Sequence, residues 1–133
     1  GREAACGVIE NFRGQERYTL PVMEMARPHG AAFIDYDARC NGTVHAICPA
    51  SFSPDEKEEM AHLARLAHET LELSQYSHSD FIVGRDGVYF IEANTLPRLT
   101  AESPLPKALE SVGCAYPQFV NHLIEDALES HRN

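Results

Sequence analysis

The segment 78–97 constrains the fold of this chain more than any other part of it. Two runs of β-branched and aromatic residues, Phe81 to Val83 and Val88 to Ile91, flank the short sequence Arg85-Asp86-Gly87. The glycine can adopt the left-handed backbone conformation that a three-residue hairpin loop requires. The segment therefore predicts a β-hairpin in which Gly84 pairs with Val88.

This register brings three polar residues to one face of the hairpin. Counting back from the loop places Asp80 opposite Glu92, with their Cβ atoms about 4.5–5.5 Å apart, so that two negative charges face each other. Asn94 lies two residues beyond Glu92 and shares its face of the strand. Two carboxylates and an amide oxygen form a ligand set that suits Mg²⁺ or Mn²⁺. The alternative is a solvated hairpin end with two unrelated acids, because a slip of one residue would carry Asp80 to the other face.

Composition and charge restrict the class of protein. A chain of 133 residues with 44% hydrophobic content is the size of one domain and can bury a core. Its net charge of −9 argues against nucleic acid as a partner. No apolar run approaches the roughly 18 residues of a membrane span, and the 4 cysteines have the spacing of neither a zinc site nor a disulfide framework. We therefore expect a soluble, cytoplasmic protein with reduced thiols and no membrane contact.

The remaining pattern predicts an α+β fold, a largely antiparallel sheet with one or both faces covered by helices. Strands are expected at 4–10, 18–25, 31–35 and 43–47, with a turn at Asn41-Gly42. Ser53, Pro54 and Glu56 form a capping box that begins a helix. Its apolar stripe is expected to face the core and consists of Met60, Leu63, Ala64, Ala67 and Leu71. Two histidines of the same helix, His62 and His68, are expected to be solvated, and further helices are expected at 107–111 and after Pro117.

Several short motifs follow one another along the chain: Gly1-Arg2-Glu3, Gly7-Val8-Ile9-Glu10, Leu20-Pro21, Asp35-Tyr36-Asp37-Ala38-Arg39, Ile47-Cys48-Pro49-Ala50, Asp80-Phe81, Tyr89 to Pro97, Thr100, Ser103 and Pro106-Lys107. In this order they resemble the C-terminal part of the D-alanine–D-alanine ligases of the ATP-grasp superfamily. The resemblance covers nearly the whole chain. It implies that 1–133 is a C-terminal ATP-grasp domain that uses ATP and Mg²⁺ to join two D-amino acids for peptidoglycan, and it allows a homodimer.

The resemblance also implies roles for individual residues. Asp80, Glu92 and Asn94 stand at the positions of the metal ligands. Glu3 matches the acid that hydrogen-bonds the ATP ribose, and Arg39 stands where a lysine of the family contacts the ATP phosphates. Ser103 matches the serine that receives the carboxylate of the second amino acid. Without the resemblance, Glu3, Arg39 and Ser103 would be taken for ordinary surface or loop residues.

Three positions depart from the family pattern. His78 replaces the arginine of an Arg-x-Asp pattern, so that a permanent cation becomes a titratable one. Arg98 replaces a glycine whose backbone approaches the reacting carbonyl. Pro104, directly after Ser103, has no N–H to donate to a bound carboxylate. We take His78, Arg98 and Ser103 as the catalytic candidates. The departures favour a second interpretation, a non-catalytic ATP-grasp-derived domain with weak nucleotide binding that acts through a partner.

The chain begins at Gly1 and runs at once into strand-like sequence. It contains neither G-x-x-x-x-G-K-[ST] nor G-x-G-x-x-G, the glycine-rich loops that hold nucleotide phosphates. In the ligases that it resembles, the N-terminal substrate domain and a small lobe with a glycine-rich loop come first. We therefore expect the N-terminal half of the same enzyme to be its partner, and no turnover by the chain alone.

Overall fold

The computed structural model describes residues 1–26 and 45–132. Within these ranges the elements in chain order are β1 (Arg2–Phe12), β2 (Gln15–Thr19), β3 (Met23–Ala26), β4 (His45–Ile47), α2 (Pro54–Thr70), β5 (Tyr76–Gly84), β6 (Gly87–Asn94), α3 (Pro104–Ser111) and α4 (Tyr116–Arg132). The strand expected at 31–35, the turn at Asn41-Gly42 and the candidate Arg39 lie outside the described residues.

The described strands form one antiparallel sheet, which confirms the α+β prediction. The strand order is β4-β3-β1-β5-β6, and β2 also pairs with β1. The single strand predicted at 18–25 is wrong, because β2 and β3 are separate strands that pair with different parts of β1. The interruption coincides with Pro21, which has no N–H for a ladder. The backbone nevertheless stays close to β1, since Leu20 N donates to Gly7 O at 2.8 Å.

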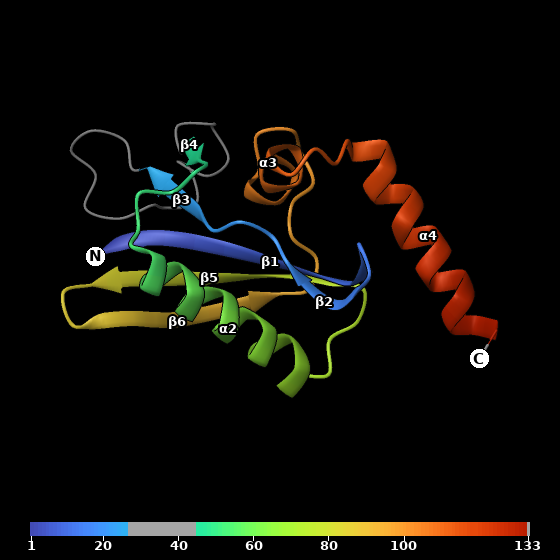
Figure 1. The fold of residues 1–133 in the computed structure, drawn as a ribbon, viewed down its shortest axis with the longest axis horizontal. Helices are drawn as coiled ribbons and strands as arrows, with labels where there is room; N and C mark the ends of the chain where they lie inside the picture. Colours follow the sequence, from blue (N-terminus) through green and yellow to red (C-terminus); the bar gives the residue numbers. More distant parts are fainter. Residues whose placement is uncertain (27–44, 133) are drawn as a thin grey trace.

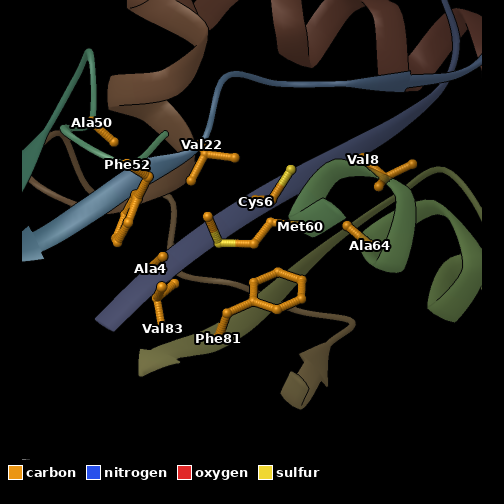
Figure 2. Packing of buried hydrophobic residues seen from close by; sticks show 10 residues of the cluster. All are labelled: Ala4, Cys6, Val8, Val22, Ala50, Phe52, Met60, Ala64, Phe81 and Val83. Atoms are coloured by element: carbon orange, nitrogen blue, oxygen red, sulfur yellow. The ribbon is translucent and has the colours of Figure 1, made fainter. Parts of the chain in front are cut away.

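Helix α2 covers one face of the sheet. Its Met60 and Ala64 are buried against alternate residues of the central strands, among them Cys6 of β1 and Phe81 of β5. Figure 2 shows Met60 beside Cys6, with Phe81 and Val83 close by. Burial in this cluster raises the pKa of the Cys6 thiol to about 12, so the thiol stays protonated and acts as a small apolar side chain.

Helices α3 and α4 pack on the opposite face of the sheet. Leu105 of α3 and Phe119 of α4 are buried in a second cluster with Ile9 of β1 and Met23 of β3. Helix α3 approaches the sheet closely at Gly7, where a Cβ would lie 2.7 Å from Leu105 Cδ1. A side chain at this position would therefore force the Leu105 and Leu20 side chains to move. Helix α4 extends away from the sheet toward its C-terminal end (Figure 1).

The capping box predicted for α2 is confirmed, whereas the predicted exposure of two of its residues, His68 and Leu71, is wrong. Ser53 Oγ accepts from Glu56 N at 3.2 Å, and the Glu56 carboxylate accepts from Ser53 N at 2.9 Å. His62 is exposed as predicted, but His68 is only 1% exposed and belongs to the buried side of the helix. Leu71, which was expected to face the core, is 56% exposed.

The hairpin predicted from segment 78–97 is formed by β5 and β6, but its loop differs from the prediction. Gly84 pairs with Gly87 rather than with Val88, which leaves only Arg85-Asp86 in the loop. Gly87 has a φ of +137°, a conformation that disfavours a side chain. Beyond Phe81 the register shifts by one residue, because Ile91 is inserted as a β-bulge. The bulge restores the predicted pairing of Asp80 with Glu92.

Candidate functional site

Five of the predicted site residues lie on one face of the sheet, the face on which α3 and α4 pack. Directly opposed residues of an antiparallel pair share a face. Asp80 is opposite Glu92 on β6 and Ala5 on β1, and His78 is opposite Asn94. Glu3 lies two residues before Ala5 on β1, roughly 7 Å along the strand, and so points to the same face. The sheet thus brings together Glu3, His78, Asp80, Glu92 and Asn94 from three strands.

The hairpin end offers hard oxygen ligands. Asp80 is partly buried, whereas Glu92 is exposed, and Asn94 Nδ2 lies 3.5 Å from Glu92 Oε1. The amide oxygen of Asn94 takes no part in that contact. No group of three or more His, Cys, Asp or Glu residues close enough for a metal occurs in the ranges 1–26 and 45–132. Two carboxylates and one amide oxygen fit Mg²⁺, which binds through a few carboxylates and leaves positions open for phosphate oxygens.

His78 lies directly beside these ligands. Its side chain is 8% exposed, and its Nδ1 is 3.7 Å from Asp80 Oδ1, within ion-pair distance if the ring is protonated. On the other side of β5, His78 is opposite Gly7, above which Leu105 of α3 packs. His78 is therefore a neighbour of Asp80 along β5 and of Gly7 across the sheet.

Ser103 is the N-cap residue of α3 and is 7% exposed. Its hydroxyl makes no capping bond with the helix and instead lies 2.6 Å from Thr100 Oγ. Ser103 N also donates to Thr100 O at 2.9 Å. Thr100 is thus a polar neighbour of Ser103. The sequence indicated Thr100 only as part of a motif and gave it no role. Pro104 occupies the first helical position, where a missing N–H costs the helix nothing.

Arg98 lies in the segment that connects β6 to α3. Leu96 is 86% exposed and Arg98 is exposed, whereas Leu99 packs against the second hydrophobic cluster. The segment is therefore held at Asn94 by pairing with His78 and at Leu99 by partial burial against the second cluster. Arg98 is held within four residues of Asn94 and two residues of Thr100.

A buried polar network on the α2 face of the sheet was not predicted from the sequence. His68 Nδ1 lies 2.7 Å from Ser77 Oγ, and His68 Nε2 lies 3.2 Å from Glu10 Oε1. The other Glu10 oxygen accepts from Gln75 N at 3.0 Å. Ser77 and His68 are each 1% exposed, so the network joins α2 to β1 and β5 and offers no room for a substrate. The four-residue spacing of Met60, Ala64 and His68 was the signal in the sequence that His68 faces inward.

A second polar cluster fastens the edge of the sheet near Gly1. Arg2 Nη2 donates to Glu24 Oε1 at 2.7 Å, and Ser51 Oγ donates to Glu24 Oε2 at 2.7 Å. Burial alone would raise the pKa of the Glu24 carboxyl, but the hydrogen bonds from Ser51 and Arg2 outweigh burial and hold the pKa below its ordinary value. This cluster joins β1, β3 and the segment that leads into α2.

None of the described helices is long and apolar enough to cross a membrane.

Comparison with known proteins gives one consistent result. The model of the family described as "D-ala D-ala ligase C-terminus" matches residues 1–125. The chain is 37% identical over 134 residues to the D-alanine–D-alanine ligase of Desulfotalea psychrophila, covering 99% of this chain and 41% of that protein. It is 33% identical to the corresponding ligase of Leptospira interrogans, covering 97% of this chain and 37% of the relative. The chain therefore spans about two fifths of the length of the curated relatives that it matches.

Solved structures agree with this similarity. The crystal structure of the D-alanine–D-alanine ligase from Bacillus anthracis complexed with ATP superimposes with a TM-score of 0.73 at 27% identity, covering 99% of this chain and 40% of that chain. The ligase from Coxiella burnetii superimposes with a TM-score of 0.77 at 23% identity, a likeness of fold alone.

Proposed function

Because the chain belongs to the D-ala D-ala ligase C-terminus family, we propose that it forms the C-terminal wall of the nucleotide site in an ATP- and Mg²⁺-dependent ligase that joins two D-amino acids. In this reaction the carboxylate of the first amino acid takes the terminal phosphoryl group of ATP, giving an acyl phosphate and ADP. The amine of the second amino acid then attacks the acyl carbon, loses a proton and displaces phosphate. The product is a dipeptide of the kind used in peptidoglycan.

The pairing of Asp80 with Glu92 is the observation that carries this proposal. Two carboxylates face each other at the hairpin end with Asn94 on the same face, although like charges in this arrangement repel. Such a pair is retained most readily where a cation offsets the charge. Asp80, Glu92 and Asn94 would hold Mg²⁺, which when bound neutralises phosphate charge during transfer.

The other candidates have distinct roles in the proposal. Glu3, on the same face of β1, accepts hydrogen bonds from the ribose of ATP. Arg39 contacts the ATP phosphates. His78, 3.7 Å from Asp80, stabilises charge on the reacting carboxylate when its ring is protonated. Ser103 donates its hydroxyl hydrogen bond to the carboxylate of the second amino acid. The N-terminal half of the ligase supplies the opposite wall.

The test joins this chain to the segment that precedes the matching region in the Desulfotalea psychrophila ligase. We expect this chimera to release phosphate from ATP only when D-alanine and Mg²⁺ are present, and to form D-alanyl-D-alanine. The chain alone should release none. Glu92→Gln should lower the rate about 100-fold or more, since groups that offset charge at the reacting centre contribute on this scale.

A matched control variant distinguishes the loss of the Asp80–Glu92 pair from the loss of any surface carboxylate. Glu69→Gln removes the same charge from an exposed position of α2, on the opposite side of the sheet. Its rate should equal that of the parent chimera. Equal loss in both variants, or steady dipeptide formation by the chain alone, would contradict the proposal.

The second candidate function is a non-catalytic domain with weak nucleotide binding that acts through a partner. The residues at 78, 98 and 104 favour it, because each departs from the pattern that the resemblance implies. A chimera that binds ATP but forms no dipeptide, and that gains turnover when these three positions are restored, would support it.

A further inference from the structure

The strand β2 has an open edge, because β1 is its only partner in the described part of the sheet. Leu20 N, directly after β2, donates to Gly7 O of β1 at 2.8 Å, so the backbone groups of Leu20 point toward β1. These directions alternate from residue to residue in an antiparallel pair. The N–H and C=O groups of Thr19 and Arg17 therefore point away from β1. Glu10, the partner of Arg17, agrees with this, since its N–H donates to the segment that precedes β5.

A groove of about 340 Å³ runs along this open edge, between β2 and α2. The residues that line it on the strand side are consecutive, 18–22, and residues 49–50 contribute as well. Consecutive residues of an extended chain point to opposite sides, so this lining follows the edge of the strand and not one of its faces. Within the ranges 1–26 and 45–132, no other segment bonds the outward backbone groups of Arg17 and Thr19. The groove thus gives an additional extended segment room beside unpaired N–H and C=O groups.

The α2 side of the groove carries two cations, although the net charge of the chain is −9. Lys57 lines the groove, and Arg65, about two turns further along α2, donates to Thr19 Oγ1 at 3.4 Å. Among the described residues, no carboxylate lies within ion-pair distance of Lys57 or Arg65. Glu58 is the one carboxylate of the described residues that lines the groove. Both cations are therefore available to an acidic ligand.

Arg17 adds a third cation, from the strand. It lies two residues before Thr19 and shares its face of β2, about 7 Å away along the strand. Its Nη1 is 3.4 Å from Oε1 of Glu16, whose side chain is 78% exposed, and its Nε has no hydrogen-bond partner in the part of the chain that the structure describes. Exposed ion pairs of this kind contribute little to stability. A carboxylate beside Thr19 would therefore compete with Glu16 for the Arg17 guanidinium.

We propose that the open edge of β2 binds an extended acidic segment of another protein, which pairs with Arg17 and Thr19 as an added strand. Main-chain hydrogen bonds supply the affinity of such complexes, and side chains supply the specificity. Lys57 and Arg65 are eight residues apart in α2, or about 12 Å along the helix axis. Two carboxylates four residues apart on one face of an added strand are about 13 Å apart, so they match the two cations.

Charge favours this occupant over a second copy of the chain. A second copy would place the cations of its own β2 beside those of the first, and like charges on neighbouring strands repel. The groove lies beside α2, whereas Asp80 and Glu92 lie on the face of the sheet that α3 and α4 cover. The inference therefore does not depend on the ligase reaction.

A synthetic peptide of sequence Thr-Glu-Val-Thr-Val-Glu-Thr, with a fluorophore at one end, serves as the probe. Its two glutamates lie four residues apart, on one face of an extended chain. Fluorescence anisotropy at low ionic strength measures its binding to the full chain. We expect the parent to bind this peptide, and Lys57→Gln and Arg65→Gln each to weaken binding about 3- to 10-fold, the scale of one partly exposed charge pair. A peptide with glutamine in place of both glutamates should bind weakly and equally to all three proteins.

Two N-methylated versions of the peptide test the backbone pairing. Methyl groups on one set of alternate amides remove the donors that face β2, whereas methyl groups on the other set leave these donors in place. One version should lose binding and the other should keep it. In NMR hydrogen exchange, the amides of Arg17 and Thr19 should become protected when the peptide binds. The amide of Leu20, already bonded to Gly7, should not change.

Arg85→Gln is the matched control, because it removes one positive charge from the exposed β5–β6 loop. It should bind the peptide as the parent does. Lys57 and Arg65 lie outside both hydrophobic clusters, so their glutamine variants should melt at the parent temperature.

Four results would overturn the inference. No binding of the glutamate peptide by the parent, or equal binding of both N-methylated versions, excludes an added strand at β2. An equal loss of binding in Arg85→Gln assigns the binding to overall charge. A dimer of the chain in analytical ultracentrifugation that the peptide does not dissociate makes a second copy the occupant of the edge.

Discussion

Glu92→Gln should melt above the parent when no divalent metal is present and below the parent when the metal is added. In the parent without metal, the Asp80 and Glu92 carboxylates face each other across the hairpin and repel. Glu92→Gln removes this repulsion and should therefore melt at a higher temperature. With Mg²⁺ or Mn²⁺ present, the parent gains the binding free energy of the metal, whereas the variant has lost one of the two acids that hold it.

The size of both effects follows from the geometry. Two unit charges about 5 Å apart repel by about 0.8 kcal/mol at the dielectric constant of water, the value suited to an exposed Glu92. For 133 residues the entropy of unfolding is about 0.3 kcal/mol per kelvin, so this repulsion corresponds to about 3 °C. Metal at about 100 times its Kd adds about 2.7 kcal/mol, or about 10 °C. The parent should then melt about 7 °C above the variant.

Thermal unfolding followed by circular dichroism measures the melting temperatures of parent and variant with and without metal. The parent, Glu92→Gln and the control Glu69→Gln are melted in EDTA and again across a titration of Mg²⁺ or Mn²⁺. Glu69→Gln should respond to metal as the parent does. If the melting temperatures of the parent and Glu92→Gln respond identically to metal, the opposed carboxylates do not form a metal site. If the variant melts below the parent without metal, the argued repulsion is absent.

Two further predictions concern the polar clusters that hold the sheet together. His68→Ala should lower the free energy of unfolding by about 3 kcal/mol or more, because it leaves a cavity and removes the hydrogen-bond partner of the buried Ser77 hydroxyl. His62→Ala, on the exposed side of the same helix, should change the free energy of unfolding by less than about 0.5 kcal/mol. Urea denaturation of both variants measures these changes. The pKa of Glu24 lies below its ordinary value, so its carboxylate stabilises the fold above that ordinary value and loses this contribution as the pH falls through the lower folded-state pKa. Parent and Glu24→Gln should therefore differ most near neutral pH and converge in acid, and a difference that stays constant with pH would refute this assignment.

Local patterns in the sequence were sufficient for the element types and for the metal-ligand hypothesis. The capping box at Ser53 and the β-rich runs around Gly87 depend on contacts within a few residues, so their chemistry can be read without the fold. The pairing of Asp80 with Glu92 was predicted from an assumed three-residue loop and is confirmed, although the observed loop is shorter. The inserted residue at Ile91 compensates for the shorter loop. The right pair thus came from a register that was wrong next to the turn.

Tertiary structure decided what local patterns left open. No spacing within β1 shows that a side chain at Gly7 would be crowded, because the crowding comes from Leu105, on a helix almost a hundred residues away. His68 was expected to be solvated. It is buried because its partners Glu10 and Ser77 come from β1 and β5, and no local pattern in α2 shows these contacts. The hydroxyl pair of Thr100 and Ser103 likewise depends on where α3 begins. The sequence by itself determined which residues are candidates for the metal site, because residue type and short spacing are local properties. The fold alone decided which of the candidates meet, because their contacts join segments far apart in the chain.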